Sequence, residues 1–278
     1  MKIVVASQED PVGRAVGELL GAGEPTDLRV GAERIRKLSE GLYVLKRAGL
    51  HIHDARLEHE LPSEVVVQTE ALIFPSVHRS ESNRPALTVH PLGNLTDQVE
   101  VGGLPLEVNP VPARLMTEAF LRWYDAGERF GVETTFEATH HGPHLRSPSY
   151  FIEIGSTARE WDRPELLKAL AEVLRGLGTD PLVHAPVVLG VGGGHYMPRF
   201  RDLVRRRQLA VGHLVPSHHL PSIGQEMAEQ LVARTPGVQG VVFARADDAQ
   251  RSPLKELLPE LREKELRPRS SQGTTSNA

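Results

Sequence analysis

The sequence predicts an α/β protein with three layers (α/β/α) built around a mixed, largely parallel sheet. Three observations support this class. Short apolar segments alternate with amphipathic segments of helical length through the second half of the chain. The N-terminus reads as a strand followed at once by a capped helix. Finally, 278 residues with 40% hydrophobic and 24% charged side chains are typical of a globular chain long enough to bury a sizeable core.

The predicted strands are short segments of apolar or alternating residues bounded by turn-forming residues. The first is the apolar run KIVVA, and a later segment alternates β-branched and polar residues up to Pro75. In order, the strands are residues 2–6, 41–45, 64–74, 132–139, 150–154, 187–191, 210–215 and 238–243. Because most of these strands are followed by a predicted helix, crossover connections between parallel neighbours are expected.

The predicted helices carry apolar residues at helical spacing. Asp10 before Pro11 is typical of an N-cap followed by the first helical residue, and Gly178 ends a helix that begins at Pro164. In order, the helices are residues 11–20, 110–130, 164–177, 197–207, 223–233 and 254–266. This order places a helix between each of the last four strands.

The remaining segments bear on domain organisation. Residues 75–110 contain no periodic run of useful length, and a loop of that size inside a compact domain is usually functional. We expect residues 1–268 to form a single catalytic domain and the polar residues 269–278 to form a disordered tail. No apolar run has the length of a signal peptide or a membrane span, so we expect a cytoplasmic protein that does not contact membranes.

Composition and motifs exclude several kinds of chemistry. The chain has no cysteine, which rules out disulfides, thiolate zinc sites and a cysteine nucleophile. It has no Gly-Lys dipeptide for a phosphate-binding P-loop, no Gly-x-Ser-x-Gly and no His-Glu-x-x-His. GVGGGH at 190–195 nearly fits a dinucleotide fingerprint, but His195 stands where the third glycine belongs. Thirteen histidines therefore remain as the main supply of metal ligands.

Polar clusters lie on the predicted strands or directly after them. They are His78–Ser82 with His90 and Asn94, Glu137–Pro143 with His144, Glu153, and His195 after three glycines. A single histidine is more often structural than a ligand, but four clusters at the carboxyl ends of strands favour a functional site. In an extended chain His140 and His141 point to opposite faces, whereas Gly142-Pro143 can break that alternation and let both converge. Both arrangements are compatible with the sequence.

Four long motifs resemble one protein family. HRSESNRPALTVHPLGN (78–94), TFEATHHGP (135–143), YFIEIGSTAREW (150–161) and GVGGGHYMPRF (190–200) are similar to the archaeal and plant D-aminoacyl-tRNA deacylases. The resemblance spans about residues 1–245. It implies hydrolysis of the ester between a D-amino acid and the 3′-terminal adenosine of tRNA, zinc dependence and a monomer. It also implies a fold related to peptidyl-tRNA hydrolases and nucleoside phosphorylases.

This chemistry suggests roles for the clustered residues, since ester hydrolysis needs an activated water and a stabilised oxyanion. The candidate catalytic residues are Glu137, His140, His141, Glu153 and His195. The candidate zinc ligands are His78, His140, His141 and His195. The candidate substrate-binding residues are Arg79, Ser80, His90, Thr139, Gly192, Gly193, Gly194, Arg205 and Arg206. Either Glu137 or Glu153 could be the base or the partner of a ligating histidine.

Other functions fit the same residues. A peptidyl-tRNA hydrolase-like esterase, a metal-dependent amidase or peptidase, and a non-catalytic tRNA- or metal-binding module are the alternatives. The net charge of −4 gives no general attraction to nucleic acid, so tRNA binding needs a local patch. The arginines between 199 and 207 are either that patch or a solvated helix face. We expect tRNA as the partner, and neither DNA nor a membrane.

Overall fold

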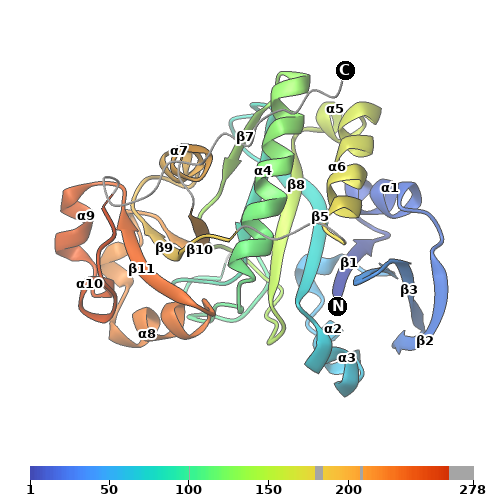
Figure 1. The fold of residues 1–278 in the computed structure, drawn as a ribbon, viewed down its shortest axis with the longest axis horizontal. Helices are drawn as coiled ribbons and strands as arrows, with labels where there is room; N and C mark the ends of the chain where they lie inside the picture. The colour runs from blue at the N-terminus through green and yellow to red at the C-terminus, as the bar shows by residue number, and fades with distance from the viewer. Residues whose placement is uncertain (100, 179–183, 207–208, 263–278) are drawn as a thin grey trace.

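Two β-sheets share one long helix in the computed structural model of this protein, which describes residues 1–99, 101–178, 184–206 and 209–262 (Figure 1). The larger sheet has eight strands in the order β2-β3-β4-β1-β5-β8-β6-β7, and the smaller has three in the order β10-β9-β11. Helix α4 (Ala113–Phe130) packs against β6 and β7 of the larger sheet and β10 of the smaller one. It therefore lies between the two sheets.

The elements follow the chain in a mostly alternating order. The remaining helices are α1 (Pro11–Leu19), α2 (Leu57–Glu60), α3 (Ser63–Gln68), α5 (Ala158–Trp161), α6 (Pro164–Gly176), α7 (Pro198–Arg206), α8 (Gln225–Ala233), α9 (Ala246–Arg251) and α10 (Leu254–Leu257), with the 3₁₀ turns η1 (His51–His53) and η2 (Leu220–Ser222). The strands are β1 (Lys2–Ser7), β2 (Glu24–Val30), β3 (Glu33–Ser39), β4 (Leu42–Arg47), β5 (Ala71–Arg79), β6 (Ala86–Pro91), β7 (Glu133–Phe136), β8 (Ser149–Ser156), β9 (Val187–Val191), β10 (Ala210–Val215) and β11 (Val238–Phe243).

Strand directions make the larger sheet mixed. β4, β1, β5 and β8 run parallel, whereas β6 runs antiparallel to β8 and β7 parallel to β6. The three strands of the smaller sheet are all parallel. The predicted fold class is thereby confirmed, but the sequence did not show that the last three strands form a sheet of their own.

The two faces of the larger sheet are buried by different groups. On β8, Tyr150 and Ile152 join the apolar cluster that contains α1, α4 and α6, while Phe151 joins a second cluster with residues of α2 and α3. Because side chains alternate along a strand, Glu153 shares the face of Phe151. This face, opposite α4, is where the polar clusters gather.

The N-terminal helix is held to β5 by a buried carboxylate. Asp10 caps α1 as predicted, since its Oδ1 accepts a hydrogen bond from the Gly13 amide at 2.7 Å. Its Oδ2 accepts two more, from the Ser76 hydroxyl at 2.9 Å and the Val77 amide at 3.1 Å. The capping residue thus fixes the start of α1 beside the strand that leads into His78.

Two predicted elements before residue 110 are wrong. Residues 64–68 of the expected 64–74 strand belong instead to the helix α3, which buries Val65, and the strand begins only at Ala71. The strand then continues through Pro75, because β1 pairs with β5 only as far as Ile73 and Pro75 needs no amide on that open side. The expected loop at 75–110 contains both the end of β5 and all of β6.

Differences also occur at the C-terminus and in the N-terminal hairpin. The helix expected at 254–266 ends at Leu257, because the residue before Pro259 is pushed to an extended conformation. Strands β2 and β3 were not predicted, because their segment of the sequence has no clear strand or helix periodicity. The predicted tail at 269–278 lies outside the described residues, and the single-domain boundary at 268 stays a prediction.

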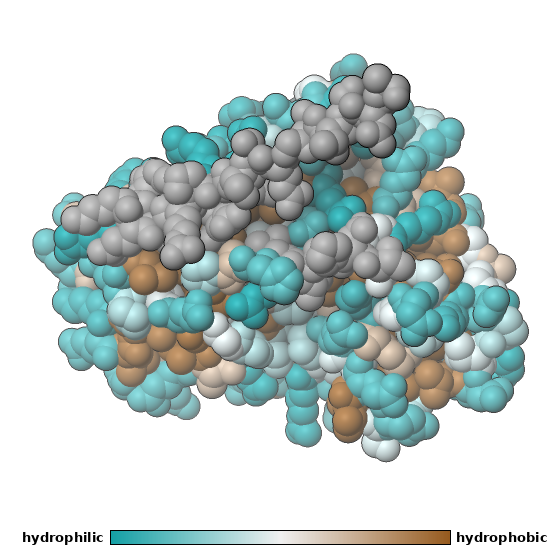
Figure 2. All heavy atoms as spheres, viewed as in Figure 1, coloured by the Kyte–Doolittle hydropathy of each residue, from teal (hydrophilic) through white to brown (hydrophobic). Residues whose placement is uncertain are grey.

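The surface is mixed in hydropathy on the face shown in Figure 2. On the face seen in Figure 2, hydrophilic side chains predominate and hydrophobic ones gather in small separate areas. Among the helices placed by the structure, none combines the length and the apolar character needed to cross a membrane.

Candidate active site

Three adjacent strands of the larger sheet place the first group of site residues on the face opposite α4. β5 carries His78, β6 carries His90 and β8 carries Glu153. The register sets Thr88 opposite Glu153 across the β6–β8 pair. The carboxyl ends of β5 and β8 meet, but β6 runs antiparallel to β8, so the expectation that all clusters share one edge is wrong for β6. The site instead crosses the middle of the sheet.

The segments after β7 and β9 bring the second group onto this face. A β-bridge joins Glu137 to Tyr196, and the Ala138 amide donates to the carbonyl of His195 at 2.8 Å. His141 adopts a left-handed backbone conformation (φ 43°), which ends the strand-like alternation. The rings of His140 and His141 consequently lie 4.3 Å apart between centroids, and those of His140 and His195 lie 4.6 Å apart. Both histidines converge, as one of the two readings of the sequence allowed.

A buried imidazole lies between two buried carboxylates. Nδ1 of His78 is 3.3 Å from Glu153 Oε2 and 3.4 Å from Glu137 Oε2. Burial lowers the pKa of His78, but the two carboxylates outweigh this and raise it to about 10. In turn His78 and His90 hold the pKa of Glu153 well below its usual value, against the effect of burial. The neighbouring histidines likewise lower the pKa of Glu137 against the effect of burial. At neutral pH His78 is therefore a buried cation flanked by two anions.

Three other histidines share one hydrogen-bonding pattern. Nδ1 of His140 lies 2.9 Å from the Ala138 carbonyl, that of His141 lies 2.8 Å from the Gly142 carbonyl, and that of His90 lies 3.2 Å from the Pro91 carbonyl. A carbonyl can only accept, so each Nδ1 donates; Nε2 of His90 faces Glu153 Oε1 at 3.7 Å. Burial and neighbouring histidines lower the pKa of His141 to about 3 and that of His140 well below its usual value.

These side chains fit a metal ion. Ligand atoms within 4.8 Å of one another are offered by three groups of residues. The groups are His90, His140 and His141; Glu137, His140 and His195; and His78, Glu137 and Glu153. Nε2 of His90 and both carboxylate oxygens of Glu137 are buried without a well-aligned hydrogen bond from any described residue. Buried polar atoms rarely lack a partner, and converging imidazole lone pairs beside carboxylates are the donor set that zinc prefers.

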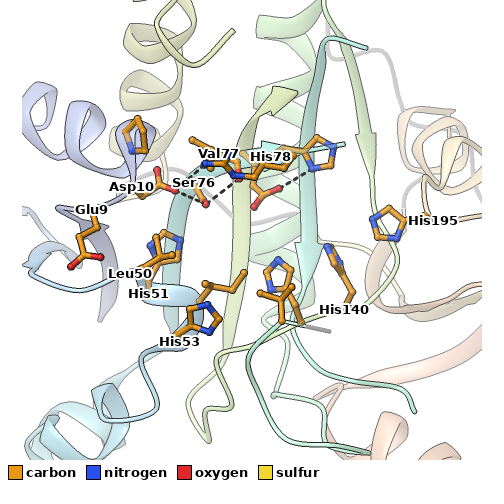
Figure 3. A pocket seen from close by; sticks show the side chains of 16 residues that line it. Glu9, Asp10, Leu50, His51, His53, Ser76, Val77, His78, His140 and His195 are labelled. Atoms are coloured by element: carbon orange, nitrogen blue, oxygen red, sulfur yellow. Dashed lines mark hydrogen bonds and ion pairs between the residues drawn. The ribbon is translucent and has the colours of Figure 1, made fainter. Parts of the chain in front are cut away.

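A cavity of about 480 Å³ begins at this cluster and runs to the N-terminus of α1. Figure 3 shows Glu9 on one side of it and His195 on the other, with His78 and His140 between them. A second cavity of about 340 Å³ adjoins it, and His140, His141 and His195 line both. These three histidines are thus accessible from both cavities.

Several predicted substrate-binding groups are occupied within the fold. The Thr139 hydroxyl is buried against His213 Nδ1 at 3.1 Å and accepts from the Leu214 amide at 3.0 Å. The amides of Gly192 and Gly193 donate to the Val215 carbonyl and to Ser217 Oγ, so these two do not point at a ligand. The remaining groups of this set differ: Arg79 stacks over Trp161 at 4.5 Å and lines the larger cavity, Ser80 contacts Ser82 on the surface, and Gly194 is exposed.

The arginines of α7 lie away from the site. The helix packs on β7, α4 and β10, and thus on the opposite side of the larger sheet from His78 and Glu153. The Arg205 guanidinium lies 3.9 Å over the Tyr124 ring, and Arg206 Nε donates to the Asp202 carbonyl at 3.2 Å. Both side chains are exposed, whereas Arg207 lies outside the described residues.

Sequence reasoning missed residues that touch the site. Tyr196 Oη is 2.7 Å from His78 Nε2, and Thr88 Oγ1 donates to Glu153 Oε2 at 3.0 Å. The Phe151 ring stacks on His90 with centroids 5.3 Å apart and planes 3° from parallel. Strand alternation could have identified two of them. Thr88 is two residues from His90 and Phe151 is two from Glu153, so each shares a face of the sheet with a predicted site residue.

Comparison with known proteins adds a family and a fold. The sequence profile of a family described as D-aminoacyl-tRNA deacylase matches residues 65–265. A D-aminoacyl-tRNA deacylase of Thermoplasma acidophilum is 31% identical over 247 residues, or 88% of this chain and 90% of the relative. One of Methanococcus maripaludis is 37% identical over 177 residues, or 60% and 69%. A crystal structure described as a conserved protein of unknown function covers 96% of both chains with a TM-score of 0.83 at 24% identity, which shows the fold alone.

Proposed function

This chain belongs to the D-aminoacyl-tRNA deacylase family, and from this membership we propose that its histidine–carboxylate site hydrolyses the ester between a D-amino acid and tRNA. One observation carries the assignment of the site. His140 and His141, which donate from Nδ1 to backbone carbonyls and keep their Nε2 lone pairs, line the same cavity as the ionised Glu153. Water, a carbonyl and a leaving alcohol can meet there without a nucleophilic side chain.

We propose that zinc is held by His90, His140 and His141. Their Nδ1 protons are fixed on backbone carbonyls, which orients each ring and is the usual support for a ligating histidine. Zinc bound there would act as a Lewis acid, polarising the ester carbonyl and making water more acidic. His78, predicted as a ligand, contacts carboxylates instead, and we propose that it neutralises them.

The two carboxylates serve different roles in this proposal. Glu153 lines the cavity, is ionised, and is held in place by Thr88 and His78, so it accepts a proton from the attacking water. Glu137 does not line either cavity but lies 3.0 Å from Nε2 of His195, which is half exposed. It accepts from Nε2 and so orients the ring, which leaves Nδ1 of His195 to accept a hydrogen bond from the substrate. The monomeric state and the cytoplasmic location stay predictions from the sequence.

Chirality tests the proposed activity. We expect kcat/KM for D-tyrosyl-tRNA to exceed that for L-tyrosyl-tRNA by at least 100-fold, since hydrolysis of correctly charged tRNA would be futile. Such discrimination needs about 2.7 kcal/mol of differential transition-state binding. Initial rates of release of labelled amino acid measure both constants. Equal rates for the enantiomers would refute the assignment.

The same assay with N-acetyl-D-tyrosyl-tRNA separates the related esterase. A peptidyl-tRNA hydrolase cleaves N-blocked substrates, whereas the proposed deacylase should cleave the free amine faster. Release of tyrosine from D-tyrosine amide would instead indicate an amidase.

Salt dependence tests whether α7 binds tRNA. Arg205 and Arg206 are exposed, and they lie on the opposite side of the larger sheet from the candidate site. We therefore propose that they contact tRNA phosphates that are remote from the 3′ end. Replacing both by alanine should flatten the plot of log binding constant against log salt by somewhat less than one unit per lost contact. Filter binding of tRNA at several salt concentrations measures this slope.

Arg129→Ala is a matched control, because Arg129 is also exposed and lies over an aromatic ring, that of Phe130. It should leave the slope unchanged. An unchanged slope in the α7 double variant as well would mean that this helix presents only a solvated face.

A further inference from the structure

The three strands of the smaller sheet end at one edge, where the segments that follow them meet at the loop bearing His195. Strands β9, β10 and β11 are parallel, so their carboxyl ends lie together, and polar groups from separate loops converge at such an edge. Gly192–Gly194 follow β9, Ser217 follows β10, and Asp248 lies on α9 after β11. Three segments that are distant in the sequence therefore come together beside the candidate site.

A chain of hydrogen bonds connects these three segments. The Gly193 amide donates to Ser217 Oγ at 2.9 Å, and the Ser217 amide donates back to the Gly193 carbonyl at 2.9 Å. The Ser217 hydroxyl donates in turn to Asp248 Oδ1 at 2.9 Å. Because a hydroxyl has a single proton, Asp248 fixes its direction and leaves a lone pair of Ser217 Oγ for the loop amide.

Asp248 also restrains the loop by direct contact. A Cβ atom at Gly192 would lie 2.1 Å from Asp248 Oδ2, so the backbone of this glycine packs directly against the carboxylate. Asp248 is only 4% exposed, and its Oδ2 accepts no hydrogen bond from a described residue. The carboxylate therefore acts on the loop through the hydrogen bond to Oδ1 and through packing.

The loop needs this support because it consists of glycines. Glycine has more backbone freedom than any other residue, so Gly192–Gly194 keep one shape only where other groups hold them. On the far side of the loop, the Ala138 amide donates to the His195 carbonyl at 2.8 Å and so anchors the histidine to the larger sheet. Ser217 and Asp248 anchor the near side to the smaller sheet.

We infer that Ser217 and Asp248 are positioning residues for His195. They hold the glycine loop so that Nε2 of His195 stays 3.0 Å from Glu137 Oε1 while the ring lines both cavities. This inference rests on the proposed function, in which the His195 ring accepts a hydrogen bond from the substrate. It gives α9 a part in the reaction although Asp248 lines neither of the two cavities.

A double-mutant cycle tests this coupling. Ser217→Ala and Asp248→Ala should each lower kcat/KM for D-tyrosyl-tRNA about 10-fold, because the His195 ring is then anchored on one side only. In a His195→Ala background the same substitutions should change kcat/KM less than about twofold, since the group that they position is absent. Asp248→Asn should restore most of the activity, because its amide oxygen still accepts from Ser217. Equal losses in both backgrounds would indicate a merely structural role and overturn the inference.

Asp247→Ala is the matched control for Asp248→Ala. Asp247 is the neighbouring carboxylate on α9, and it is exposed. Its removal should leave kcat/KM at the wild-type value, with or without His195.

Nuclear magnetic resonance of the histidine rings gives a readout independent of turnover. In protein that carries isotope-labelled histidine, the His195 ring signals are identified by their loss in His195→Ala. They should shift or broaden in Ser217→Ala and Asp248→Ala, whereas the signals of the buried His51 on η1 should stay in place.

The two measurements also separate this inference from the proposed function. Unchanged His195 signals in both variants would overturn the positioning role even if the wild type hydrolyses D-aminoacyl-tRNA. If the His195 signals respond as expected but the wild type hydrolyses no D-aminoacyl-tRNA, the proposed function fails while Ser217 and Asp248 still position the ring.

Discussion

His140→Ala is expected to lower kcat on D-tyrosyl-tRNA by about 10³-fold and to weaken binding of the proposed zinc ion. His140 belongs to two of the three groups of potential ligands, so its loss affects both. Its ring is also fixed by the Ala138 carbonyl and contacts His90 and His195, with centroids 4.0 and 4.6 Å away. Single-turnover rates and metal analysis of the purified variant measure the two effects.

His144→Ala is the control for this substitution. His144 follows in the same segment but belongs to none of the ligand groups found among the described residues. It should keep nearly normal activity and zinc content. Normal activity of His140→Ala, with circular dichroism showing an intact fold, would place the site elsewhere.

Glu153→Gln is expected to lower kcat by about 10³-fold without changing the metal content, which separates the proposed base from the proposed zinc ligands. His78 and His90 hold the pKa of Glu153 below its usual value, so the wild-type side chain is ionised at neutral pH and can accept a proton. Glutamine has the same shape and can still accept the hydrogen bond from Thr88, but it cannot take a proton. Activity and metal content are measured on the same preparation.

Glu118→Gln serves as the matched control, because Glu118 is a carboxylate on α4 that pairs with Arg122 outside the site. It should behave as wild type. Loss of zinc from Glu153→Gln would identify Glu153 as a zinc ligand. It would contradict the proposal that Glu153 acts only as the base.

The residue types at the site could be predicted from the sequence, but not their arrangement. His78, Glu137, His140, His141, Glu153 and His195 do come together in the structure. The sequence predicted that they would meet at one edge, because strands alternating with helices indicate parallel neighbours. The antiparallel direction of β6 depends on its pairing with β8, which is distant in the sequence. The local pattern of residues in β6 does not indicate whether its neighbour runs parallel or antiparallel to it.

Two further differences have local physical causes. Gly192 and Gly193 suggested a loop whose amides hold a ligand. Glycine is needed at these positions for another reason, because their φ angles are 106° and 93° and Asp248 approaches Gly192 closely. Tyr196 was missed because it looked like part of a turn before α7. Its hydrogen bond to His78 exists only through the bridge that pairs it with Glu137.

Helix α4 has a consequence for how the protein unfolds. Its buried residues Met116, Phe120 and Trp123 belong to one apolar cluster that also includes Val4 and Ile73 of the larger sheet and Val188, Val211 and Leu214 of the smaller one. Separating the sheets would expose this shared face to water at a large cost in free energy. The two sheets therefore do not behave as independently melting modules, and unfolding is cooperative across them. Because Trp123 also donates to the Glu153 carbonyl at 3.2 Å, we expect the candidate site to be lost in the same transition.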